Sequence, residues 1–263
     1  MLLDGFDALD DEWGAYALLL PTGAMGSSRL DGLVLTAGLA YRGDRPVERL
    51  QAFRSLVTGR PMVGASLQLE GLPTVVADSY VGMRAAVEHL IEAHGYQRIA
   101  FITGPAASEE AADRYRAYAD ALADHGIGMD EALVAEGDYT PAGGARAMAA
   151  LLEREVPLDA VVCASDDTAV GAFETLQARG IEVPDDLALV GFDDSRAARQ
   201  LPVPLTTVRQ PVQAIGYQAA GLLVSLLREE TASTGAGVAP AAVPTHLVTR
   251  RSCGCYPAHV QAL

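Results

Sequence analysis

Hydroxyl and carboxyl side chains follow two short apolar runs in the second half of the chain, at residues 160–164 and 187–191. A carboxylate accepts hydrogen bonds from several hydroxyl groups at once, which suits a site for a small molecule rich in hydroxyls. Any one of these acids is better interpreted as a helix cap, but two clusters at one sheet edge favour a polar site. The residues concerned are Ser165, Asp166, Asp167, Asp193 and Asp194.

The two apolar runs have the composition of strands that are buried on both faces of a parallel sheet. Between them, Ala169, Phe173 and Leu176 recur at helical spacing, and Gly180 stands where a helix ends. Strand, helix and strand at this length form a βαβ unit. Because parallel strands end at one edge of the sheet, both clusters are expected where open α/β sheets bind ligands.

Apolar strands and amphipathic helices alternate along the rest of the chain, which predicts a doubly wound α/β fold. Further strands are predicted at 16–20, 30–36, 61–64, 74–77, 98–104 and 246–249. Helices are predicted at 4–14, 47–57, 79–94, 109–125, 141–153 and 215–226, with Ser79 as the cap of the third.

Three ordered segments carry a resemblance to a known family: ASDDTAVGA, IEVPDDLALVGFDD and PLTTVRQP. They resemble the ligand-binding core of the LacI/GalR regulators, which is similar to the type I periplasmic sugar-binding proteins. The resemblance is dense from about Gly71 to Cys253. It implies two doubly wound parallel-sheet subdomains joined by three crossings. The N-terminal subdomain is expected at 1–104 with 210–242, and the C-terminal subdomain at 105–209 with 243–263. The first hinge crossing is expected at Gly104–Pro105, and the return crossing at 205–211.

The beginning of the chain departs from this family. The gap between the predicted strands at 16–20 and 30–36 is shorter than the roughly 12 residues that a parallel crossover needs. The family normally has a further first strand and a full helix here. We therefore expect a truncated N-terminal subdomain.

The resemblance also implies a ligand-binding site around three residues. Asp193 matches the family's effector-binding aspartate in the GFDD motif, and Phe192 matches the neighbouring aromatic residue. Arg114 falls where the family places an effector-contacting arginine. Without the resemblance, Arg114 is equally well interpreted as a surface arginine paired with Glu110 or Asp113.

Four further residues complete the predicted site. Ser165 falls where relatives often carry asparagine, and Asp166 follows it, so hydrogen bonding is retained with a different geometry. Asp78 and Ser79 are expected to face the cleft from the other subdomain. Asp78 is equally well interpreted as an acid at a helix start.

Catalytic, metal and cofactor sites have little support. The chain contains no G-x-x-x-x-G-K-[ST] loop, no G-x-G-x-x-G after a strand and no H-E-x-x-H motif. His94 and His125 precede glycines that end helices, and neither has metal-ligand spacing. The pair Cys253 and Cys255 could bind a metal or oxidise, but without a nearby Cys/His pair it is interpreted as a plain tail. We predict no catalytic residue, no metal and no cofactor.

Charge and hydropathy limit the partners. The net charge is −15, from 34 acids and 19 bases, and the pair Arg250 and Arg251 is too small a basic patch to attract DNA. No apolar run approaches the roughly 20 residues that span a membrane. The acidic start lacks the features of a secretory signal. A cytoplasmic protein without membrane contact is expected.

The preferred hypothesis is a non-enzymatic sensor that closes on a small polar effector, a sugar or a nucleoside, and regulates transcription or another signalling output. The family's DNA-reading head is absent from this sequence, so the chain alone should not bind DNA, and the family's cores imply a homodimer. The alternatives are a periplasmic receptor of a transporter, which would need an export signal, and an α/β enzyme, which would need a nucleophile or metal set. The effector's identity stays open.

Overall fold

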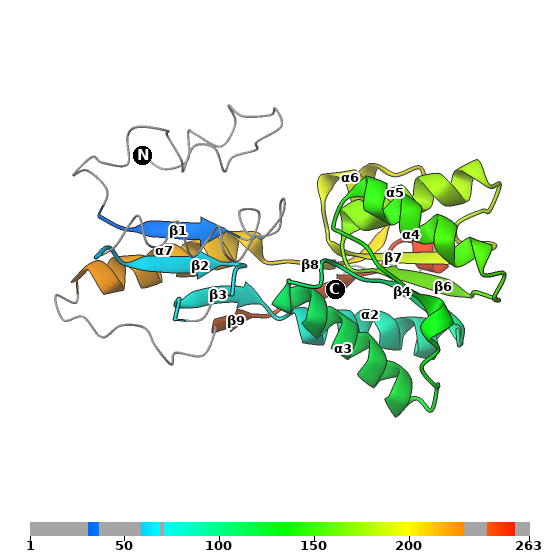
Figure 1. Ribbon diagram of the computed structural model, residues 1–263, viewed down its shortest axis with the longest axis horizontal. Coiled ribbons are helices and arrows are strands. Elements are labelled where there is room, and N and C mark those ends of the chain that lie inside the picture. Colours follow the sequence, from blue (N-terminus) through cyan, green and yellow to red (C-terminus); the bar gives the residue numbers. More distant parts are fainter. Residues whose placement is uncertain (1–30, 37–58, 69–70, 229–240, 256–263) are drawn as a thin grey trace. The chain divides into compact units, whose positions relative to one another are not determined.

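The computed structural model describes residues 31–36, 59–68, 71–228 and 241–255 (Figure 1). The elements expected at 4–14, 16–20 and 47–57 lie outside these residues. The chain forms two compact units: Met1–Val76 with Gln213–Ala242, and Ala77–Val212 with Val243–Leu263. It therefore passes between the units three times, as the fold class predicts.

The first unit contains a four-stranded sheet in the order β1-β2-β3-β9. The strands are β1 (Leu33–Thr36), β2 (Met62–Ala65), β3 (Thr74–Ala77) and β9 (Ala241–Val243). The pairs β1–β2 and β2–β3 are parallel. The helix α7 (Val212–Arg228) lies against this sheet, with Ile215 and Ala219 buried (Figure 1).

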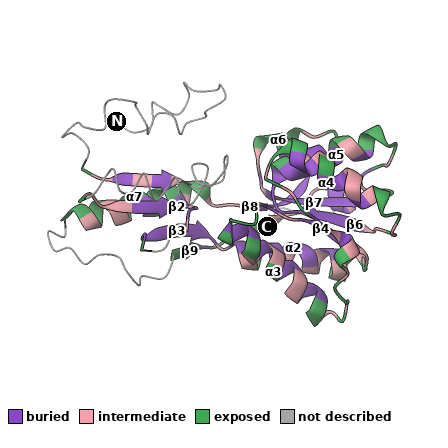
Figure 2. Ribbon diagram, viewed as in Figure 1, coloured by how far each residue is buried: buried purple, intermediate pink, exposed green. Residues whose placement is uncertain are grey.

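The second unit contains a six-stranded sheet in the order β10-β8-β7-β6-β4-β5. All neighbours are parallel except β10, which runs antiparallel to β8. Figure 2 shows the central strands as buried, which explains their continuous apolar runs. The strands are β4 (Ile99–Ile102), β5 (Val134–Ala135), β6 (Ala160–Cys163), β7 (Ala188–Asp193), β8 (Thr206–Arg209) and β10 (His246–Val248).

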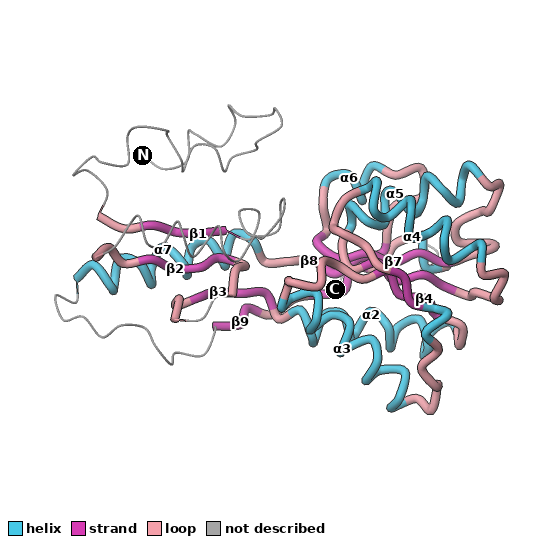
Figure 3. Tube along the Cα trace, viewed as in Figure 1, coloured by secondary structure: helices cyan, strands magenta, loops and turns pink. Residues whose placement is uncertain are grey.

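Helices cover both faces of the second sheet (Figure 3). One face packs on α2 (Ser79–His94) and α3 (Glu109–Asp124), through a core that includes Phe101 and Val162. The other face packs on α4 (Pro141–Glu153), α5 (Asp166–Ala178) and α6 (Arg196–Gln200), through Ile102 and Val161. Short 3-10 helices, η3 and η4, lie at Glu131–Leu133 and Arg251–Cys253. Successive residues of each strand therefore enter opposite cores.

The expected subdomain boundary at residue 104 was wrong. β4 pairs with β6 over Ile99–Ile102 and Ala160–Cys163, and α2 packs on α3. Strand β4 and helix α2 therefore belong to the second unit. The chain leaves the first unit after Val76. Gly104–Pro105 leads from β4 towards α3 within one unit and is not a crossing.

The helix starts position several polar side chains. Asp78, not Ser79, caps α2, because its carboxylate accepts a hydrogen bond from the Val81 amide at 3.1 Å. Ser165 caps α5 by accepting from the Thr168 amide at 3.2 Å. None of the helices in the described part of the chain is long and apolar enough to cross a membrane.

Candidate functional site

All seven predicted site residues lie in the second unit. Asp78 and Ser79 were expected to approach the others from the opposite subdomain, and that expectation was wrong. They start α2, which packs beside α3 in the same unit, and this brings Ser79 to Arg114. The site residues of this unit can therefore be described together.

Arg114 is the most connected of them. Its side chain is buried within α3, and its guanidinium lies 3.7 Å from the ring centroid of Phe192. It donates hydrogen bonds to the Ala164 carbonyl at 2.6 Å and to the Ser79 hydroxyl at 3.3 Å. It also pairs with Glu110 at 3.5 Å. Arg114 thus links helices α2 and α3 to the ends of β6 and β7, as a surface arginine would not.

Asp193 ends β7 in an unusual backbone conformation, with φ +130°. Its carboxylate accepts a hydrogen bond from the Gln210 side-chain amide at 2.5 Å. Burial raises the pKa of Asp193, and the charge of Arg114 opposes that shift. Residues other than glycine rarely adopt a positive φ, and such strained positions gather at binding and catalytic sites.

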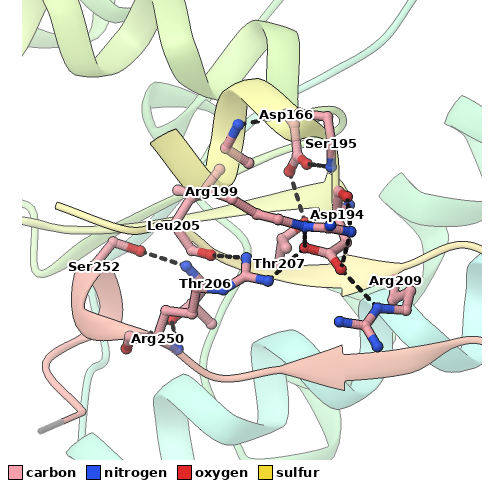
Figure 4. Close-up of polar contacts among 11 residues, drawn as sticks. Asp166, Asp194, Ser195, Arg199, Leu205, Thr206, Thr207, Arg209, Arg250 and Ser252 are labelled. Atoms are coloured by element: carbon pink, nitrogen blue, oxygen red, sulfur yellow. Dashed lines mark hydrogen bonds and ion pairs between the residues drawn. The ribbon is translucent and has the colours of Figure 1, made fainter. Parts of the chain in front are cut away.

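Asp166 and Ser165 make bonds within the fold. Asp166 is fully buried and accepts from the Thr207 hydroxyl at 2.6 Å and the Ser195 amide at 2.7 Å (Figure 4). Burial and the nearby charge of Asp193 raise the pKa of Asp166 to about 7. Ser165 is occupied as the cap of α5. Ser165 thus fixes the start of α5, and Asp166 ties that start to β8 and to the loop that follows β7.

A cluster of ion pairs around the buried carboxylate of Asp194 was not predicted from the sequence. Its side chain is fully buried and binds Arg199, Arg209 and Arg250, with closest distances of 2.8, 2.6 and 2.5 Å (Figure 4). Burial opposes ionisation, yet the hydrogen bonds from these arginines lower the pKa of Asp194 to about 2. Asp193 and Asp194 therefore point to different partners, as adjacent residues at a strand end are expected to do.

Two further side chains join the surroundings of Arg114. The Tyr139 ring centroid lies 5.7 Å from its guanidinium. Glu110 is buried, and burial raises its pKa. Its Oε1 is one of two buried side-chain oxygens without a hydrogen-bond partner in the described part of the chain. The neighbourhood of Arg114 thus combines a charged donor, aromatic faces and an unused acceptor.

Comparison with known proteins shows what kind of core this is. Residues 87–253 match the family described as a periplasmic binding protein-like domain. CelR of Thermobifida fusca, an HTH-type transcriptional regulator, is 35% identical over 88% of this chain and 65% of its own length. The solved CelR–cellobiose complex is similar with a TM-score of 0.74, over 88% of this chain and 68% of that one. The chain belongs to the LacI/GalR family of regulators.

Other LacI/GalR relatives agree. The repressor CytR of Escherichia coli is 36% identical over 80% of this chain and 60% of its own length. The structure of the Escherichia coli repressor AscG has a TM-score of 0.66 at 31% identity, over 85% of this chain and 78% of that one. The chain thus spans less than two thirds of the CelR and CytR sequences and covers the effector-binding core. Membership of this family of regulators confirms the prediction of a non-enzymatic protein.

Proposed function

We propose that this core binds a sugar at a site centred on Asp193, Arg114 and Phe192. One observation carries the proposal. A buried guanidinium stacks 3.7 Å from the Phe192 ring, next to a strand-end aspartate held at φ +130°. Because these groups are already fixed, they lose little further conformational entropy when a ligand binds.

The chemistry suits a ligand with many hydroxyls. Asp193 accepts hydrogen bonds, Arg114 donates them, and Tyr139 offers an apolar ring face, while the buried Phe192 ring supports the Arg114 guanidinium. A ligand hydroxyl that reached Glu110 Oε1 would satisfy an acceptor that has no partner in the described residues. The CelR–cellobiose complex supports a sugar, and a disaccharide of glucose in particular, over a nucleoside. The match to transcriptional regulators favours this proposal over a transport receptor or an enzyme.

Binding of cellobiose to the untagged 263-residue chain is the direct test. We expect heat release in titration calorimetry and a raised melting temperature, because a ligand at 100 times its Kd adds about 2.7 kcal/mol to stability. Other disaccharides, monosaccharides and nucleosides serve as the comparison panel. Binding of a nucleoside alone, or of no member of the panel, would contradict a sugar effector.

We propose the partners on the basis of the same family membership. The chain forms a homodimer in the cytoplasm, and DNA is read by a helix-turn-helix segment outside these 263 residues, as the HTH-type relatives suggest. With a net charge of −15, the chain alone should show no sequence-dependent DNA binding at physiological salt.

Light scattering of the chain at tens of micromolar should give the mass of a dimer. A monomer would contradict the proposed dimer, and nanomolar binding to one DNA sequence would contradict a DNA-reading segment outside these residues.

A further inference from the structure

The cysteine pair near the end of the chain does not form a plain tail. The prediction that no Cys/His pair lies near Cys253 and Cys255 was wrong. Helix α2 presents His89 and His94 to both cysteines, and the four possible ligand atoms lie within 4.8 Å of one another. The two pairs come from segments more than 150 residues apart in the sequence.

The separations fit a tetrahedral ion. Cys253 Sγ lies 3.6 Å from His89 Nε2, and Cys255 Sγ lies 3.4 Å from His89 Nε2 and 3.5 Å from His94 Nε2. Zinc bonds of about 2.3 Å to sulfur and about 2.0–2.1 Å to nitrogen, at tetrahedral angles, put those atoms about 3.5 Å apart. Three of the sulfur–nitrogen separations therefore already match those between ligands of one zinc ion, and all four ligand atoms lie within 4.8 Å of one another.

A glycine allows the two thiols to turn towards the helix. Gly254 has φ +98°, a conformation that other residues rarely adopt. A Cβ there would also lie 3.3 Å from the Tyr96 hydroxyl and 3.4 Å from the His94 ring. The C-G-C sequence thus permits a tight approach of Cys255 to His94.

The segment that carries the cysteines is held independently of any ion. The Ser252 hydroxyl donates to the Leu189 carbonyl at 2.6 Å and accepts from the Thr206 amide at 2.7 Å. Arg250 donates to the Leu205 carbonyl at 2.7 Å and binds Asp194, and Figure 4 shows this anchorage. Because these bonds fix η4 against β7 and β8, the cysteines are positioned before metal enters, which favours tight binding.

We propose that His89, His94, Cys253 and Cys255 bind one Zn²⁺ in a closed structural site. Two sulfur and two nitrogen ligands in a tetrahedral arrangement are typical of zinc and disfavour calcium and magnesium. Four protein ligands leave no open position for a substrate. The ion would fasten the segment 250–255, which follows the last crossing, to helix α2 of the same unit.

Metal analysis of the untagged chain, kept reduced, tests the site. After saturation with zinc and removal of the excess, we expect one zinc ion per chain. Cobalt added to the metal-free chain should give the absorption of a tetrahedral ion with thiolate ligands. Chelation should lower the melting temperature, because an ion that binds the folded state stabilises it.

Matched variants separate the ligands from other histidines and cysteines. Cys255→Ser and His94→Gln should weaken zinc binding by more than the ~10–100-fold that changes around metal ligands typically cause. His246→Gln, at an exposed position of β10, and Cys163→Ala, in β6, should retain the ion. Zinc retained by both ligand variants, a zinc-free wild type, or cobalt spectra without thiolate bands would overturn the proposal. Preferential retention of copper(I) from a mixture would overturn the choice of metal.

Discussion

Asp194→Asn is expected to lower the free energy of unfolding by about 3 kcal/mol at pH 7. Removing one partner of a buried ion pair typically costs about 3–5 kcal/mol. The lower end applies because the side chains of Arg199 and Arg209 are 55% and 54% exposed, so water can solvate them when the carboxylate is lost. Asparagine suits the test because it tolerates the positive φ of this position, +58°, better than alanine.

Urea melts of the wild type and the variant measure this loss. Asp113→Asn is a suitable control, because Asp113 pairs with Arg116 on the surface, where an ion pair contributes at most about 1 kcal/mol. A loss of less than about 1 kcal/mol in Asp194→Asn would show that the three arginines do not depend on this carboxylate.

The same variant has a characteristic pH dependence. The pKa of Asp194 is lowered from 3.8 to about 2, so its charged form stabilises the fold at every pH above about 4. That stabilisation is lost as the pH falls from about 4 to about 2, and the difference in unfolding free energy between wild type and variant should narrow there.

The contribution of Asp166 to stability changes with pH in the opposite direction. Because its folded pKa is raised to about 7, its contribution becomes less favourable as the pH rises from about 4 to about 7.

Local pattern predicted the longer helices and the central strands of the second unit, but not β5, α6 or β8. The runs at 160–164 and 187–191 became β6 and β7, and the spacing of Ala169, Phe173 and Leu176 became α5. The pattern could not assign the strand at 98–104 to a sheet. An apolar run specifies burial, whereas its neighbour is set by tertiary packing, so β4 was placed in the wrong unit.

The partners within the polar clusters could not be predicted from their spacing in the sequence. Asp194 binds Arg199, Arg209 and Arg250, which lie 5, 15 and 56 residues away, and no motif connects them. The cysteine pair and its histidines are separated by more than 150 residues. Only the fold brings such residues together. The family resemblance predicted roles for Arg114 and Asp193 but not the burial of Arg114, which changes the expected result of its substitution.

Arg114→Ala is therefore expected to reduce both stability and effector affinity. The substitution removes a buried charge that pairs with Glu110 and binds the Ala164 carbonyl. We therefore expect the free energy of unfolding, measured in urea melts, to fall by about 3 kcal/mol or more. Arg114→Ala cannot by itself assign the effector site, because a loss of binding would also follow from a loss of structure.

Asp193→Asn gives the cleaner test. Asparagine has the same shape as aspartate, so the backbone at this position is disturbed little, and the substitution removes one charged acceptor. We expect the free energy of sugar binding to weaken by about 1.5–3 kcal/mol, or roughly ten- to a hundredfold in affinity. Gln210→Ala is the matched control, because it removes the side-chain amide that Asp193 binds while keeping the carboxylate. If Asp193 contacts the effector, calorimetry should show weak binding in Asp193→Asn and much smaller loss in Gln210→Ala. If Asp193 only ties the turn to Gln210, both variants should be destabilised alike and bind with full affinity, and the effector contact would have to be assigned elsewhere.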